Sequence, residues 1–122
     1  MDNADQTPPG AAAASPPDAP AGLLVCPLPD RAGARAAGEI NVTTRAAWEH
    51  ALEHAVREGG DEYYMELSAV TFVDVAGVTA LAMAARRLGE GQRIVLHRPP
   101  ATLSRVLDMF WPDLSTIEVS AS

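Results

Sequence analysis

After Gly22, short apolar runs alternate with longer stretches in which apolar residues recur every three or four positions. The short runs are typical of strands and the longer stretches of helices that pack one face on a sheet. Strands that alternate with helices of about 10–15 residues predict βαβ units and a largely parallel sheet. The sequence therefore predicts an α/β fold: a single small domain with a mixed, mainly parallel β-sheet flanked by helices. The predicted strands are 23–26, 34–37 (weak), 63–67, 71–73, 93–97 and 116–119.

Three amphipathic stretches predict the helices. The first follows Thr43 or Thr44, either of which can cap it, and ends at the glycines at 59 and 60. The second follows Asp74 and ends near Gly89, and the third runs up to Pro112. The first helix shows the clearest core-facing stripe: Trp48, Ala51, Leu52, Ala55 and Val56.

Residues 1–22 differ in composition from the rest of the chain. They contain seven alanines and five of the ten prolines, with no arginine and no large apolar side chain besides Met1. Such a segment cannot bury enough surface to offset its ordering entropy. We expect a disordered tail at 1–22 and a folded domain at 23–122. A proline-rich partner ligand is the alternative, but the prolines form no PxxP series with basic anchors.

Charge and cysteine content narrow the function classes. The chain of 122 residues has 48% apolar residues and a net charge of −7, and all nine basic residues are arginines. No basic stripe is present, so a nucleic-acid partner is not expected. The longest uncharged apolar run, 75–85, has eleven residues, whereas a membrane span needs about 20. Cys26 is the single cysteine, so we expect no disulfide within the chain and a cytoplasmic location.

One literal metal-site motif occurs, His50-Ala-Leu-Glu53-His54, an H-x-x-E-H string. In a zinc hydrolase the two imidazoles would bind the metal and the glutamate would polarise a water. Here both histidines lie on the polar side of the predicted helix, and the one other histidine is His97. We therefore favour a solvated helix face and expect neither a metal site nor a cofactor.

A serine-hydrolase site and a phosphate loop are also disfavoured. Ser68 and Ser104 lack a Gly-x-Ser-x-Gly elbow, and the glycines do not form a phosphate-binding loop. The sequence thus predicts a protein without catalytic activity.

Met109, Phe110 and Trp111 form an apolar cluster before Pro112. Helical spacing predicts that Phe110 lies in the core and that Met109 and Trp111 are exposed. Exposed aromatic residues can anchor a partner, but closing the core is the favoured role.

The most informative stretch is 67–81, where strand-like residues lead to Asp74, then to small residues and an alanine-rich helix. The Asp74 carboxylate can accept hydrogen bonds from the free N–H groups of the first helical turn. Ala76 and Gly77 keep this helix start narrow, so another surface can approach the backbone closely. Taken alone, the pattern predicts a capped helix that tolerates close packing.

These residues resemble the STAS family, the domain of bacterial anti-sigma factor antagonists and of sulfate transporter tails. The resemblance runs from about residue 23 to 119. Residues 38–41 (Gly-Glu-Ile-Asn) are similar to the family's Gly-Glu-Leu-Asp turn before the first helix. Residues 67–68 and 71–78 are similar to its Leu-Ser…Phe-Ile-Asp-Ser-Ser-Gly-Leu signature. In the antagonists, the serine after the signature aspartate is phosphorylated by an anti-sigma factor that is also a kinase.

The chain departs from the family at this serine. Val75 occupies the phosphoacceptor position and Ala76 the second serine position, so the usual switch is missing. The nearest hydroxyls, on Thr71 and Thr79, are expected to point elsewhere. We also expect that the final helix carried by many members is missing, and a sheet face left exposed would then favour a homodimer or docking.

The resemblance implies a non-enzymatic interaction module in bacterial transcription regulation. The expected partner is a kinase-type anti-sigma factor or another STAS-associated regulator. The alternative is a small-molecule-sensing or transporter-associated STAS domain, in which the helix start would accept an anion. The predicted partner-binding residues share the start of the second helix: Asp74, Val75, Ala76, Gly77 and Val78.

Overall fold

The computed structural model describes residues 22–58 and 60–120. Apart from Gly22, the predicted tail lies outside the described residues, so its disorder stays a prediction.

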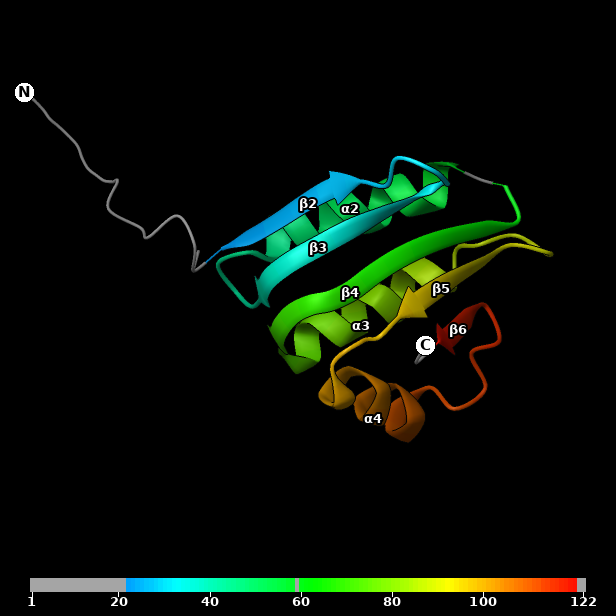
Figure 1. Ribbon diagram of the computed structural model, residues 1–122. Helices are drawn as coiled ribbons and strands as arrows, with labels where there is room; N and C mark the ends of the chain where they lie inside the picture. Colours follow the sequence, from blue (N-terminus) through cyan, green and yellow to red (C-terminus); the bar gives the residue numbers. More distant parts are fainter. Residues whose placement is uncertain (1–21, 59, 121–122) are drawn as a thin grey trace, which may run out of the picture.

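Five strands form one sheet, and their order in the sheet is their order in the chain (Figure 1). The first pair is antiparallel and the other three pairs are parallel, as the alternating pattern predicts. The first strand has an edge position, in agreement with its prolines. The strands are β2 (Leu23–Pro27), β3 (Gly33–Ile40), β4 (Glu62–Val73), β5 (Arg93–His97) and β6 (Ile117–Ser120).

Each parallel connection contains one helix: α2 (Arg45–Glu58), α3 (Val75–Ala85) and α4 (Ala101–Phe110). Right-handed crossovers that always step to the next strand place all three helices on one face of the sheet. Helix α3 contacts both α2 and α4, and Figure 1 shows α2 and α3 side by side behind the strands. None of the described helices has the length and apolar character needed to cross a bilayer.

The core lies between this face and the helices. Its fully buried side chains come from every layer: Ile40, Trp48, Met65, Leu67, Val78, Leu81, Ile94, Leu96 and Leu103. Strand β3, which includes Ile40, also contributes the buried residues Ala34 and Ala36. Their small side chains let α2 pack close to the sheet. The predicted α/β fold with a mainly parallel sheet is confirmed.

Strand β4 is longer than the two short runs that the sequence predicts. It is one strand of 12 residues, and its pairing with β3 shifts register between Arg35 and Ala37 and again between Gly38 and Glu39. At each shift β4 contains one extra residue, which reverses the faces of the residues that follow. The buried residues Leu67, Val70 and Val73 are therefore three positions apart instead of two, which obscures the strand pattern.

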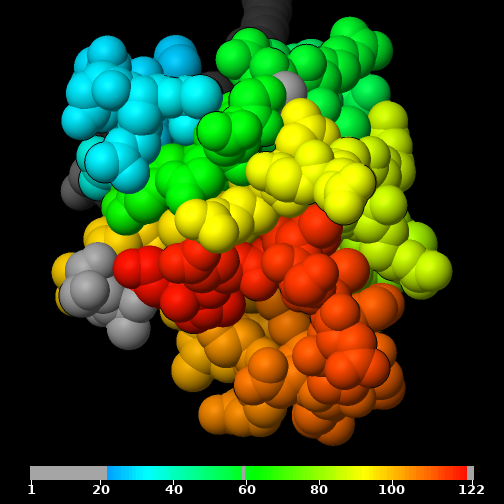
Figure 2. All heavy atoms as spheres, turned by 90° about the vertical axis from the view of Figure 1, so that its right-hand side faces the viewer, coloured from blue at the N-terminus to red at the C-terminus, as the bar shows by residue number. Residues whose placement is uncertain are grey.

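The end of α4 corrects a second prediction. Phe110 is not in the core: it is 60% exposed, and Met109 beside it is 64% exposed. Trp111, expected at the surface, is only partly exposed and packs against the core. The helix ends at Phe110, so the chain turns there and brings Trp111 to the inside instead. Figure 2 shows α4 in orange beside β6 in red.

The sheet face turned away from the helices carries several charged groups on β4, β5 and β6. Glu66 forms an ion pair with His97, and Tyr64 stacks on the His97 ring with the centroids 5.6 Å apart. Arg93 pairs with Glu62 and Glu118 across three strands. The strands also carry exposed large apolar side chains, on Leu24, Phe72 and Val119. The homodimer stays a prediction.

Candidate partner-binding site

The predicted site lies at the carboxyl end of β4, where α3 begins. Asp74 is the N-cap residue of α3, in an extended conformation (φ −88°, ψ 170°). Its Oδ1 accepts a hydrogen bond from the Gly77 N–H at 2.7 Å. Its own N–H donates to the Ile40 carbonyl at 3.1 Å and joins the helix start to the end of β3. The predicted capping role of Asp74 is confirmed.

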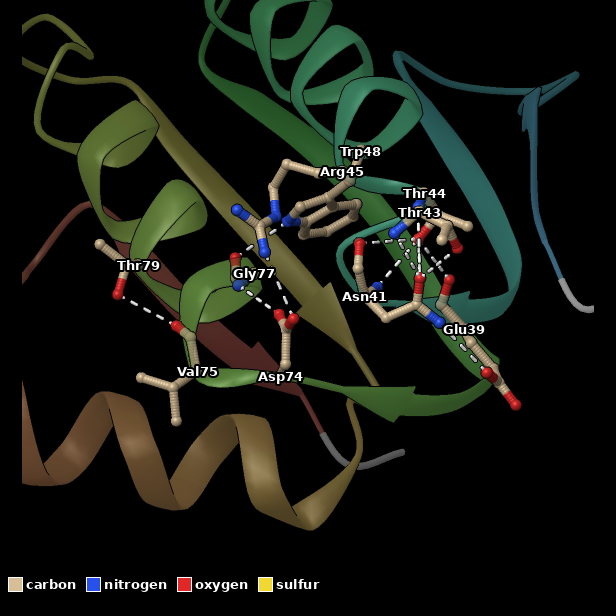
Figure 3. A network of polar contacts seen from close by, with 10 residues as sticks. All are labelled: Glu39, Asn41, Thr43, Thr44, Arg45, Trp48, Asp74, Val75, Gly77 and Thr79. Carbon is tan, nitrogen blue, oxygen red and sulfur yellow. Dashed lines mark hydrogen bonds and ion pairs between the residues drawn. The ribbon is translucent and has the colours of Figure 1, made fainter.

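Two side chains of α2 fix this helix start from the side (Figure 3). Arg45 Nη2 lies 3.3 Å from Asp74 Oδ2. Trp48, which is fully buried, donates from its indole nitrogen to the Gly77 carbonyl at 2.9 Å. The first turn of α3 is therefore bonded to α2 through both a charged and a neutral contact.

Gly77 is required by close packing. A Cβ at this position would lie 2.7 Å from Ile40 Cγ2, too close for two carbon atoms without a shift, and 3.1 Å from Val73 Cγ2, a tight contact. The predicted narrow helix start is present, but it faces inward. Gly77 lets α3 pack against the ends of β3 and β4 and offers no surface to a partner.

The loop before α2 lies next to the site and is held by its own hydrogen bonds (Figure 3). Asn41 Oδ1 accepts from the Thr43 N–H at 2.9 Å and from the Thr43 hydroxyl at 2.7 Å. The Thr44 hydroxyl donates to the Glu39 carbonyl at 2.8 Å. Gly38, in the motif at 38–41, has φ +123°, a conformation that favours glycine. The motif therefore builds a fixed turn beside Asp74.

The exposed part of the site is smaller than predicted. Val75 is 57% exposed, Ala76 is exposed, and the Asp74 side chain is 29% exposed. Val78 is fully buried in the core, so its side chain cannot touch a partner, and this part of the prediction is wrong. Val78 lies on the side of α3 that packs on the core, together with Leu81 and Ala82, whereas Val75, the first residue of the helix, is exposed. We call Asp74, Val75 and Ala76 the Val75 patch.

Hydroxyl groups near the patch already have acceptors. The Thr79 hydroxyl donates to the Val75 carbonyl at 3.0 Å, and the Thr71 hydroxyl to the Gly38 carbonyl at 3.3 Å. The Ser68 hydroxyl donates to the Glu66 carboxylate on the same strand. None of these three hydroxyls takes the position of the Val75 side chain.

The residues of the H-x-x-E-H string are used for other contacts. His54 Nδ1 lies 3.2 Å from the Tyr63 hydroxyl, and Glu53 is bound by Arg57 and Arg87. The hydrogen bonds from Arg87 above all, with those from Arg57, lower the pKa of Glu53, although burial acts in the opposite direction. Within residues 22–58 and 60–120, no three His, Cys, Asp or Glu side chains are placed to hold a metal ion.

Arg45 and Trp48 are the functional neighbours that sequence reasoning missed. The pattern places Arg45 on the polar side of α2 and Trp48 in the core stripe, and neither position indicates contact with α3. The buried indole N–H of Trp48 was the available signal, because such a group needs an acceptor.

The Val75 patch presents the Asp74 carboxylate, which caps α3, and the alkyl side chains of Val75 and Ala76. Asp74 already accepts from the helix N-terminus, so the usual place for an anionic ligand is filled. Exposed alkyl groups beside a fixed charge suit contact with another protein.

Comparison with known proteins agrees with this arrangement. The family model described as "Mlab, STAS domain" matches residues 29–111, which includes the Val75 patch. A solved structure of an anti-sigma factor antagonist from Mycobacterium paratuberculosis is 25% identical, with a TM-score of 0.66, over 88% of this chain and 91% of that chain. No curated protein matches the sequence. Because the family match covers more than half of the 122 residues, the protein belongs to the STAS domain family.

Proposed function

We propose that this STAS domain is an anti-sigma factor antagonist that binds a kinase-type anti-sigma factor through the Val75 patch and is not phosphorylated there. The similarity to the solved antagonist over nearly the whole chain supports an antagonist role. The protein acts as an interaction module of bacterial transcription regulation in the cytoplasm, without catalytic activity of its own.

The proposal that the domain is not phosphorylated at the Val75 patch rests on one observation. By resemblance, the residue that follows the signature aspartate is the phosphoacceptor. In this chain it is Val75, the first residue of α3, and its 57% exposed side chain is an isopropyl group. A kinase that reaches this position finds no oxygen to attack the γ-phosphate of ATP.

The consequence is a change in regulation. Phosphorylation of a serine adds about −1.5 to −2 charges. Beside Asp74, such a charge would repel an acidic partner surface and disrupt an apolar contact. With valine, this inactivating step is missing, so the antagonist stays competent to bind and the partner is regulated by other means.

The alternative is a small-molecule-sensing or transporter-associated STAS domain. The Asp74 carboxylate lies where an anion would bind, with its Oδ1 2.7 Å from the Gly77 nitrogen, and this disfavours an anion sensor. Gene neighbourhood separates the two: a kinase-type anti-sigma gene beside this gene supports antagonism, and a transporter operon supports the alternative.

The direct experiment is calorimetric titration of the full chain with the anti-sigma factor encoded nearest to its gene. We expect binding that Val75→Glu weakens by about 1–3 kcal/mol, because a charge enters an apolar contact beside Asp74. Met109→Glu is the control, since Met109 is similarly exposed (64% against 57% for Val75) but lies on α4. Equal loss in both variants, or no effect of Val75→Glu, would reject the patch.

A further inference from the structure

Helix α3 has no charged residue in its eleven positions, a composition typical of a helix that is buried on every side. The structure buries the side that faces the sheet, including Leu81 and Ala82. The outer side is open: Val75 and Met83 are 57% and 43% exposed. Between them on the same side lie Ala76, Thr79 and Ala80, all exposed or half-exposed.

This outer side forms one wall of a groove, which we call the α2–α3 groove. Its volume is about 840 Å³. Leu52 and Ala84, both buried, lie at its base. On each wall the lining residues span about 12 Å, from Arg45 to Glu53 on α2 and from Val75 to Met83 on α3, at 1.5 Å per residue. A helix of two to three turns fits this length.

Charged groups surround the groove. Some of them form ion pairs with one another, and one has no partner among the described residues. Arg45 binds Asp74 at one end, and Arg87 binds both carboxylate oxygens of Glu53 at the other, at 2.8 and 3.2 Å. Glu49 lies on the α2 wall between these pairs. Among residues 22–58 and 60–120, no hydrogen bond or ion pair reaches its carboxylate. The groove therefore has one unpaired negative charge, on a chain whose net charge is −7.

We propose that the α2–α3 groove binds one amphipathic helix of the partner protein. The apolar side of that helix lies along α3 from Val75 to Met83, and a lysine or arginine on its flank pairs with Glu49. The inference rests on the proposed function insofar as Val75 belongs to both surfaces. It adds the shape and charge of the partner element: helical, with small or medium apolar side chains and a basic flank.

A test that needs no knowledge of the partner uses two designed peptides of about 16 residues, long enough for a marginal isolated helix. Both have leucines at helical spacing; one has lysine flanks and the other has glutamate at the same positions. The probe is ¹⁵N-labelled full chain followed by NMR. We expect the lysine peptide to shift the amide signals of residues 45–53 and 75–87, and the glutamate peptide to bind about tenfold more weakly.

Three variants test the apolar wall and the charge of the groove separately. Met83→Glu should weaken the lysine peptide about tenfold, because it places a charge on the apolar wall. Glu49→Lys should reverse the preference between the peptides, whereas Glu90→Lys, an exposed charge reversal that does not line the groove, should not. Folding of each variant is checked by its own NMR spectrum.

Absence of binding, shifts confined to α4, or equal binding of both peptides would overturn the inference. The same variants separate it from the proposed function. In the complex with the anti-sigma factor, loss of binding in Val75→Glu but not in Met83→Glu would overturn the groove and leave the antagonist role intact.

Discussion

Asp74 makes two interactions that substitution can separate: the cap on Gly77 and the ion pair with Arg45. Asp74→Ala removes both and should lower the free energy of unfolding by about 0.5–2 kcal/mol. Asp74→Asn keeps a capping oxygen and loses only the charge. Since an ion pair this near the surface contributes about 0–1 kcal/mol, we expect most of the stability to remain. Urea unfolding of both variants checks this, and equal losses would contradict the importance of the cap.

Gly77 is a second position where a single added carbon atom should change the stability of the fold. Gly77→Ala places a methyl group 2.7 Å from Ile40 Cγ2, so α3 must move away from the strand ends. Overpacking of this kind costs about 1–3 kcal/mol, which exceeds the gain of about 1 kcal/mol from alanine in a helix. Thermal unfolding measures the difference. Ala76→Val, at the exposed neighbour, is the control and should stay within about 0.5 kcal/mol; a stable Gly77→Ala would show that the packing is loose.

At the residue scale the sequence indicated correctly that Asp74 caps α3, and contact of Val75 and Ala76 with a partner stays a prediction. The sequence did not identify the exposed side of α3 clearly, because the helix has no charged residue and Thr79 is its one polar side chain. Nor could it show that Arg45 and Trp48 reach across from another helix, since that contact depends on how α2 and α3 lie on the sheet.

At the element scale, an exposed ion pair between Glu53 and Arg87 joins α2 to the turn after α3, and its contribution depends on pH. The hydrogen bonds from Arg87 lower the pKa of Glu53 in the folded protein. A lowered folded pKa means that the pair stabilises the fold above the ordinary value of 4.5, and that this stabilisation is lost as the pH falls through the folded pKa. Acid should therefore weaken the attachment of α2 to the end of α3.

The test is urea unfolding at pH 7 and pH 3 of the wild-type protein and of Glu53→Gln. The wild type should lose more stability between the two pH values, because only it loses the charged pair. Glu49→Gln is the matched control on the same helix and should behave like the wild type. An equal pH dependence in the wild type and Glu53→Gln would contradict the prediction.

The bounds of an element were predictable where the pattern of apolar residues is regular, as in α2. The prediction failed where local geometry interrupts the spacing of those residues. The two register shifts in β4 place its core residues three positions apart, so the strand looks like two pieces in the sequence. Phe110, the last residue of α4, is exposed although its helical spacing predicts the core. The extra residues of a bulge leave no clear signal in a single sequence, whereas Pro112 does mark the end of α4, because the residue before a proline disfavours the helical conformation.

At the scale of the whole molecule, the fold was predictable because strand and helix signals alternate through the entire domain. The domain boundary stays a prediction with a simple test. Deletion of residues 2–22, which lack large apolar side chains, should change the free energy of unfolding by less than about 0.5 kcal/mol. Calorimetric melting of both chains measures it, and a large drop in the melting temperature would show that this segment packs on the domain.

The central claim is that a partner kinase binds this protein and leaves it unmodified, and intact-mass spectrometry tests it most directly. The full chain is incubated with the neighbouring anti-sigma factor and ATP, with Val75→Ser as the variant that restores a hydroxyl. We expect a stable complex, an unchanged mass for the wild type and a gain of one phosphate in Val75→Ser. One phosphate on the wild-type protein, mapped to Thr71, Thr79 or Ser68, would contradict the account.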